Sequence, residues 1–146
     1  MQTGSRFAMA VHVMALVAYR DGQRATSEYL AASVNTHPVM IRRLLLALQK
    51  GGLIETRRGA SFGSRLSRPP EQIHLWSIYR AIDQDRSFRL PPLKANKACP
   101  IGGGIEEALR QVFVGAQDAL ERELSHTTLA EILRSLGNKP QLTAAA

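Results

Sequence analysis

The 146-residue sequence predicts a mainly α-helical fold that carries one small β-hairpin. Apolar residues recur at helical spacing in six segments, which is the main sign of this fold class. Strand-like residues are confined to a short stretch, 53–68, that contains a glycine-rich turn. The helical pattern after residue 100 continues for about six turns. A chain of this length is expected to form one domain and to bury a core without disulfides.

The first expected helix runs from about residue 5 to residue 19 and is apolar nearly all round. This pattern predicts neighbours on more than one side of the helix. His12 interrupts it, and no other ligand lies at metal-binding spacing, so a satisfied core or interface histidine is expected. The stretch is too short to cross a bilayer and has no convincing cleavage site after it. We therefore expect a cytoplasmic protein that does not bind a membrane.

Two further helices follow the first. A short one is expected over residues 26–34, and a second begins with Thr36 as its cap and Pro38 in its first turn. Gly51 ends the second helix. Its buried stripe is formed by apolar residues at helical spacing, Ile41, Leu44, Leu45 and Leu48. Two helices joined by a tight turn after a buried helix give a helix-turn-helix outline.

A basic hairpin follows this helix-turn-helix directly. "LIETRRG" predicts one strand, "GASFG" a turn, and "SRLSR" the returning strand before two prolines. The sequence therefore predicts a winged helix-turn-helix. Another helix is expected over residues 73–82, and residues 83–100 have no periodicity and three prolines, which indicates a linker loop.

The long C-terminal helix is expected from Ile101 or Gly104 to about Leu124. A capping box at residues 128–131 opens a last short helix. The predicted division is a winged helix-turn-helix domain at 1–82, a linker loop at 83–100, the two C-terminal helices at 101–137, and a disordered tail at 138–146. One face of the long helix is apolar and is formed by Ile105, Leu109, Val112, Phe113, Ala116, Leu120 and Leu124.

Positive charge is concentrated in the N-terminal part of the chain. Residues 1–90 contain thirteen Lys or Arg and six Asp or Glu, whereas residues 91–146 contain six of each, so the net charge of +7 lies in the first ninety residues. Within residues 36–68, seven basic residues accompany one acid, Glu55. This favours an anionic partner, with nucleic acid ahead of a membrane. A merely solvated basic surface remains the alternative.

Several motifs in this order resemble the Rrf2 family of bacterial winged-helix regulators. They are "ASVNTHPVMIRRLLLALQKGGLIETRRG", "LSRPPEQIHLWSIYRAID", "ACPIGGGIEEALRQVF" and "LSHTTLAEIL", and the resemblance covers about residues 4–136. It implies a transcriptional regulator, most often a repressor. It also implies that the long helix crosses its twin in a homodimer that binds a palindromic operator in double-stranded DNA. The resemblance names no effector.

The chain departs from the iron–sulfur members of that family. Those members hold a cluster with three cysteines in the loop before the dimerisation helix, and here residues 83–104 contain only Cys99. The chain is therefore expected to bind no cluster, metal or other cofactor, and it resembles the cluster-free, YwnA-like branch. Phe62 stands in the wing where the family usually has glycine.

The second helix of a helix-turn-helix presents its N-terminal turn to base edges in the major groove. Hydroxyl, apolar and guanidinium groups can all read such edges. Helix initiation alone remains the alternative role for Pro38 and Val39. The residues expected at this surface are Thr36, His37, Pro38, Val39 and Met40 in the first turn, with Arg42 and Arg43 one turn further on.

The wing supplies the other expected DNA contacts. The resemblance places Arg58 in the minor groove, while Arg57 and Arg65 would bind phosphates, which fixes position without reading sequence. Arg68, beside Pro69, is expected to be only solvated.

Cys99 is the candidate sensor. It precedes Pro100 and is expected to lie at the start of the dimerisation helix, where the helix dipole favours a thiolate, with Lys94 and Lys97 adding positive charge. A redox or electrophile sensor and an unreactive thiol packed at the dimer interface both remain open.

Catalysis has little support, because the sequence contains no nucleophile–base order and no metal-ligand spacing. The glycines at 102–104 follow no strand, so they are a weak sign of a phosphate loop. The chain is therefore not expected to be an enzyme. Two alternatives remain, a winged-helix module that binds another protein and a thiol-based enzyme.

Overall fold

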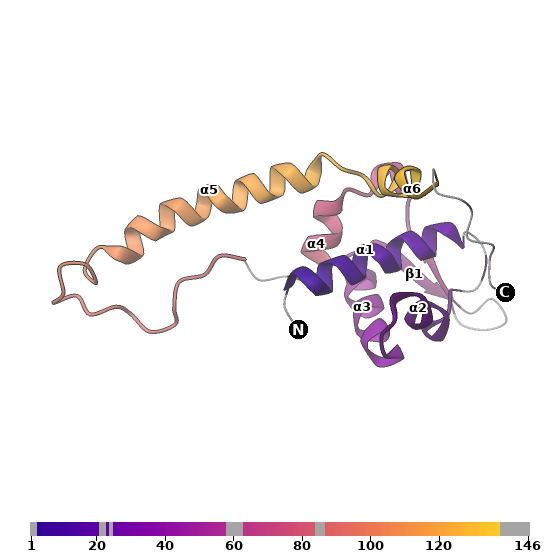
Figure 1. The fold of residues 1–146 in the computed structure, drawn as a ribbon, viewed down its shortest axis with the longest axis horizontal. Helices are drawn as coiled ribbons and strands as arrows, with labels where there is room; N and C mark the ends of the chain where they lie inside the picture. The colour runs from indigo at the N-terminus through magenta and orange to yellow at the C-terminus, as the bar shows by residue number, and fades with distance from the viewer. Residues whose placement is uncertain (1–2, 21–22, 24, 58–62, 84–86, 138–146) are drawn as a thin grey trace.

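The computed structural model describes residues 3–20, 23, 25–57, 63–83 and 87–137. Its elements confirm the mainly helical class with a small β wing (Figure 1). They are α1 (Thr3–Tyr19), α2 (Ser27–Val34), α3 (Pro38–Lys50), β1 (Ile54–Arg57), β2 (Gly63–Leu66), the 3-10 turn η1 (Pro70–Gln72), α4 (Leu75–Ile82), α5 (Ile105–Ser125) and α6 (Leu129–Gly137). The expected tail at 138–146 lies outside the described residues, as do Arg58 and Phe62.

A single apolar core holds α1 to α4, the hairpin and α6 together as a head. Helix α1 contacts α2, α3, α4, α6 and β2, which confirms that it has neighbours on several sides. The largest fully buried side chains come from all of these parts: Met14, Leu30, Ile41, Leu44, Leu48, Leu53, Ile73, Ile78 and Leu129. His12 is satisfied, since its Nε2 lies 3.1 Å from the Ser33 hydroxyl. Its side chain is exposed, however, so the expectation of a core position is wrong.

The turn between α2 and α3 is built by local capping. Asn35 adopts a left-handed conformation with φ of 60° and ends α2. The cap of α3 is His37 and not Thr36, because its Nδ1 accepts from the Val39 N–H at 3.5 Å. Proline at the first helical position makes the preceding residue the cap. The Thr36 N–H is instead used by the end of α2, donating to the Ala31 carbonyl.

The hairpin is short and is anchored at its base. Strands β1 and β2 pair antiparallel from Ile54↔Leu66 to Arg57↔Gly63, so at the base of the hairpin β1 begins one residue later and β2 ends two residues earlier than the sequence predicted. Leu53 and Ile54 are buried, whereas the following residues of β1 are exposed. Gly52 has φ of +73°, a conformation that favours glycine, and this explains how the chain leaves α3 for the wing.

Helix α5 projects from the head, and none of its residues is buried (Figure 1). The described part of the linker, 87–104, runs out from the head before α5 returns to it (Figure 1). The Phe88 ring packs on Phe113 with 5.7 Å between ring centroids, and the Ala95 N–H donates to Glu106 Oε1 at 2.9 Å. The linker therefore folds onto the helix that it precedes.

Helix α6 packs back into the head. The predicted capping box is confirmed, because the Thr128 N–H donates to Glu131 Oε2 at 2.7 Å and the Glu131 N–H donates to Thr128 Oγ1 at 3.2 Å. Leu129 is fully buried, and its N–H donates to the Ile73 carbonyl. The predicted domain division stays a prediction. The contacts of α6 show that this last helix shares the core of the head. Among the described helices, none is long and apolar enough to span a bilayer.

Candidate nucleic-acid interface

The outer face of α3 carries the predicted base-reading residues. Ile41, Leu44 and Leu48 are buried, so helical periodicity turns the residues between them outward. Val39 is 43% exposed, and His37 is exposed beside it. The half-buried members of the first turn are Thr36, Pro38 and Met40. His37 and Val39 are therefore the first-turn side chains most available to a DNA groove.

The two arginines of α3 have different surroundings. Arg42 is ion-paired to Glu28 of α2, with Nη2 2.8 Å from Oε1, and more than half of each side chain is exposed. An exposed pair of this kind contributes about 0–1 kcal/mol, so a phosphate or base edge can compete for the guanidinium. Arg43 is exposed and borders a shallow hollow that Arg6, Met40 and Leu44 also line.

Sequence reasoning missed Arg6 and Leu46 at this surface. The fold brings Arg6 of α1 to the hollow beside Arg43, more than thirty residues away in the chain, and no local spacing could have indicated this. Leu46 is exposed and lies seven residues after Val39, which puts both on one helical face. That spacing was visible in the sequence, and an apolar side chain there is suited to a thymine methyl group.

The wing arginines that the structure describes are both exposed. Arg57 ends β1, and Arg65 lies on β2 directly opposite Glu55 in the strand register. Arg58, the predicted minor-groove residue, lies outside the described residues. Two guanidinium groups on the strands leading to the wing tip are well suited to phosphate oxygens.

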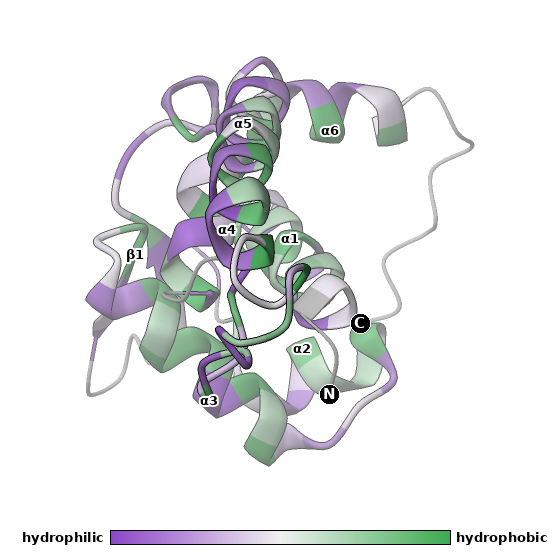
Figure 2. Ribbon diagram, turned by 90° about the vertical axis from the view of Figure 1, so that its left-hand side faces the viewer, coloured by the Kyte–Doolittle hydropathy of each residue, from purple (hydrophilic) through white to green (hydrophobic). Residues whose placement is uncertain are grey.

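The apolar face of α5 lacks a covering element along much of its length. Val112 is 64% exposed and Ile105 is also exposed, although they lie on the same stripe. Seen nearly end-on, the α5 ribbon carries both hydrophobic and hydrophilic residues (Figure 2). Val114, 48% exposed, lies on the opposite face of the helix and is not part of the stripe. The stripe residues that are half-buried in the single chain are Leu109, Phe113, Ala116, Leu120 and Leu124.

Cys99 is exposed and lies in a series of turns that precede α5. The expectation that it starts the helix is wrong, because the glycines at 102–104 delay the helix until Ile105. The pKa of the Cys99 thiol is nevertheless below its ordinary value, because the backbone N–H groups of Gly102 and then Ile101 donate to the sulfur. A Cβ on Gly102 would lie 2.4 Å from the Asn96 carbonyl oxygen, so this turn requires glycine.

Comparison with known proteins agrees with this arrangement. Residues 3–135 match the model of the family described as Rrf2, iron-dependent transcriptional regulator. The provisionally named HTH-type transcriptional regulator YwnA of Bacillus subtilis strain 168 is 33% identical over 132 residues, covering 90% of this chain and 97% of YwnA.

Solved structures share the fold. The crystal structure of a protein provisionally described as DNA-binding is 32% identical, with a TM-score of 0.70 over 88% of this chain and 98% of that one. CymR, described as the global cysteine regulator of B. subtilis, has a TM-score of 0.66 at 21% identity, over 89% of this chain and 94% of its own. The winged helix followed by a long C-terminal helix is thus a known architecture.

The residues of this chain do not fit an iron–sulfur cluster. Such clusters are held mainly by several cysteine thiolates, and the whole sequence contains one cysteine. Across the described ranges, no group of three or more His, Cys, Asp or Glu side chains is placed to hold a metal ion. The donor set of a single chain is therefore too small for an iron–sulfur cluster.

Proposed function

Because the chain belongs to the Rrf2 family of transcriptional regulators, we propose that it acts as a homodimeric repressor that binds a palindromic operator in duplex DNA. The observation that carries this proposal is the outward face of α3, where Val39 and Arg43 are exposed at the end of the helix that a helix-turn-helix directs into the major groove. A regulator of this kind works where the chromosome is, so we place it in the cytoplasm.

Specific contacts are assigned to the first three turns of α3. Arg43 has no carboxylate partner among the described residues and can fork onto guanine, whereas Arg42 must first leave Glu28. Val39 and Leu46 offer apolar contact to thymine methyl groups. Arg6, Arg57 and Arg65 supply charge to phosphates, which positions the protein without reading bases.

The homodimer is assigned to the apolar face of α5. A palindromic operator requires two equivalent reading helices related by a two-fold axis. The helix extends away from the head with Val112 uncovered, and an exposed apolar stripe of this length marks a protein contact. A second copy of the same helix fits because it brings an identical stripe.

Arg58 and Arg68 should contribute unequally to the affinity for the operator. Arg58→Ala is expected to weaken operator binding more than Arg68→Ala, since an arginine at the wing tip can enter a narrow minor groove and Arg68 lies past the hairpin. Fluorescence anisotropy with one labelled operator gives both affinities. Equal losses would show that the wing contributes only diffuse charge.

Cys99 is proposed as a sensor of oxidants. Its thiolate would attack one oxygen of hydrogen peroxide, breaking the O–O bond to give sulfenic acid and hydroxide. Condensation with a second thiol, from the other subunit or a small molecule, would then form a disulfide and release water. The exposed position of the sulfur and its lowered pKa support this proposal. The interface-packed thiol remains the competing interpretation.

The sensor proposal predicts a difference between Cys99→Ser and the unaltered protein. Operator affinity of the unaltered protein should fall after peroxide, because an adduct at residue 99 disturbs the turns leading into α5, whereas Cys99→Ser should not respond. Restoration by dithiothreitol identifies a reversible product. If both proteins respond alike, or neither does, the thiol has no sensing role.

The reactivity of Cys99 should depend on pH in a defined direction. Alkylation by iodoacetamide follows the thiolate fraction, so the midpoint of the rate against pH should lie below that of the urea-unfolded chain, because the folded pKa is lowered. Gly102→Ala must displace the turn from Asn96 and should move the midpoint upward. Identical midpoints in all three samples would contradict the hydrogen-bonded thiolate.

The two other functional classes make different predictions. A protein-binding winged helix would show no preference for any genomic DNA fragment. A thiol-based enzyme would need a side-chain base for Cys99, whereas its pKa is lowered by backbone N–H groups.

A further inference from the structure

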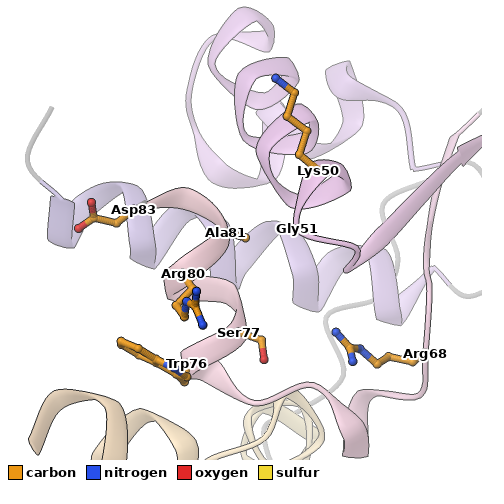
Figure 3. A pocket seen from close by; sticks show the side chains of 8 residues that line it. All are labelled: Lys50, Gly51, Arg68, Trp76, Ser77, Arg80, Ala81 and Asp83. Atoms are coloured by element: carbon orange, nitrogen blue, oxygen red, sulfur yellow. The ribbon is translucent and has the colours of Figure 1, made fainter. Parts of the chain in front are cut away.

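A second basic site lies at the opposite end of α3 from the reading turn. It is an open hollow of about 510 Å³ lined by Lys50 and Gly51 of the α3 end, Arg68 after the wing, and Trp76, Ser77, Arg80, Ala81 and Asp83 (Figure 3). From Pro38 to Lys50 the helix rises by roughly 18 Å at 1.5 Å per residue, so the hollow is remote from the groove-facing turn.

The side chains around this hollow are arranged for an anion. The Arg80 and Arg68 side chains lie on either side of the hollow, and the Ser77 hydroxyl lies between them in the view of Figure 3. Neither arginine has a carboxylate partner among the described residues. Two guanidinium groups that face each other repel, and an oxyanion between them replaces that repulsion with charge-assisted hydrogen bonds.

Asp83, the acid at the edge of the hollow, already accepts a hydrogen bond. Asp83 Oδ2 accepts a hydrogen bond from the Tyr79 hydroxyl at 3.0 Å, and the carboxylate points away from Arg80 (Figure 3). Burial, together with this hydrogen bond to Asp83, raises the pKa of Tyr79 to about 12, so the phenol remains a donor at neutral pH. Among the described residues, Asp83 forms no ion pair with Arg68 or Arg80.

An aromatic wall stands beside the charged groups. Trp76 stacks on Tyr79 with 5.5 Å between centroids and 12° between planes, and Tyr79 packs edge-on against Phe7 of α1. The Trp76 ring lines the hollow, so a flat or apolar part of a ligand can lie against it. Trp76 is also the chain's one tryptophan.

From this geometry we infer that the hollow is a binding site for a small molecule that carries a phosphate or carboxylate group, held by Arg68, Arg80 and Ser77. The same groups could instead hold a phosphate of bound DNA. The position at the base of the wing, beyond both the reading turn and the strands leading to the wing tip, favours a free ligand. The inference goes beyond the proposed function and can be tested in the absence of DNA.

The hollow also borders α4 and the base of the wing, the segments that hold α3 in place. A Cβ on Gly51 would lie 2.7 Å from the Ala81 Cβ, so the end of α3 and α4 are packed as closely as their backbones allow. A ligand that joins Arg80 of α4 to Arg68 after β2 would fix the wing base relative to both helices.

Fluorescence of Trp76 tests the inference directly. The full-length protein is titrated separately with inorganic phosphate, citrate and adenosine monophosphate, with chloride adjusted to hold ionic strength constant. At least one probe should give a saturable change. Its Kd should be at least about tenfold weaker in Arg80→Gln and in Arg68→Gln, since each loses a charge-assisted contact worth roughly 1.5–3 kcal/mol. Arg134→Gln, at an exposed position of α6, is the matched control and should bind like the unaltered protein.

Two results would overturn the inference. One is the absence of a saturable response to all three probes, or equal affinities in the arginine variants and the control. The other is a loss of DNA affinity in Arg68→Gln and Arg80→Gln, measured without added oxyanion, in a protein that binds no free probe, because this would assign the hollow to the DNA backbone. Circular dichroism confirms that the surface variants are folded.

Discussion

Val112→Glu combined with Leu120→Glu is expected to turn a dimer into a monomer and to abolish tight operator binding. Both side chains belong to the apolar stripe of α5, where Val112 is 64% exposed in the single chain and Leu120 is half-buried. Burying a side chain of this size is worth about 1.5–3 kcal/mol, and each dimer would lose four such contacts and gain four buried charges. The association constant should fall by more than about a thousandfold.

Sedimentation equilibrium distinguishes the two states, since the dimer has twice the chain mass of 16.0 kDa. Val114→Glu is the matched control, because Val114 is 48% exposed on the opposite face of the same helix and should leave the mass unchanged. A monomeric unaltered protein at micromolar concentration would contradict the dimer. So would dissociation by Val114→Glu but not by the double variant.

Arg43→Gln is expected to cause the largest loss of sequence-specific binding from a single substitution. A bidentate arginine–guanine contact contributes about 1–3 kcal/mol of discrimination, and a two-fold dimer contains two of them. The loss should therefore be roughly 2–6 kcal/mol, or about thirtyfold or more in Kd. Affinity for unrelated DNA should change far less.

Competition binding with operator and random DNA measures both affinities for each variant. Arg42→Gln should have a smaller effect than Arg43→Gln, because Arg42 begins in an ion pair with Glu28. Arg134→Gln supplies the control for lost charge outside the proposed surface. If Arg43→Gln weakens operator and random DNA equally, Arg43 binds phosphate and does not read bases.

The helical elements were predictable because their signals are local. Asn35, Pro38 and Gly52 punctuate the helix-turn-helix through backbone preferences that depend on neighbouring residues alone. The capping box at Thr128 was likewise visible in four residues. The long α5 was evident from the repeat of its apolar stripe, and the resemblance then supplied a reason for its length.

Features that depend on tertiary contact were not predictable. His12 was expected in the core or at an interface; Ser33, on another helix, satisfies the ring at the surface, so the core alternative is wrong and the interface alternative stays a prediction. Arg6 reaches the neighbourhood of Arg43 only after α1 packs on α3. For Cys99 the sequence suggested a lowered pKa for the wrong reason, since adjacent turn N–H groups and not the helix start stabilise the thiolate. The three glycines at 102–104 favoured turns over an earlier start of α5.

The central claim is that α3 and the wing form a DNA-binding surface, and the salt dependence of operator binding tests it most directly. The three arginines per subunit that are assigned to phosphates, Arg6, Arg57 and Arg65, would place about six phosphate contacts in the dimer complex. Each released counterion contributes about −0.9 to the slope of log K against log salt, so a slope of about −5 is expected on duplex fragments selected from the protein's own genome. A flat salt response, or no binding to any such fragment at low salt, would contradict the claim.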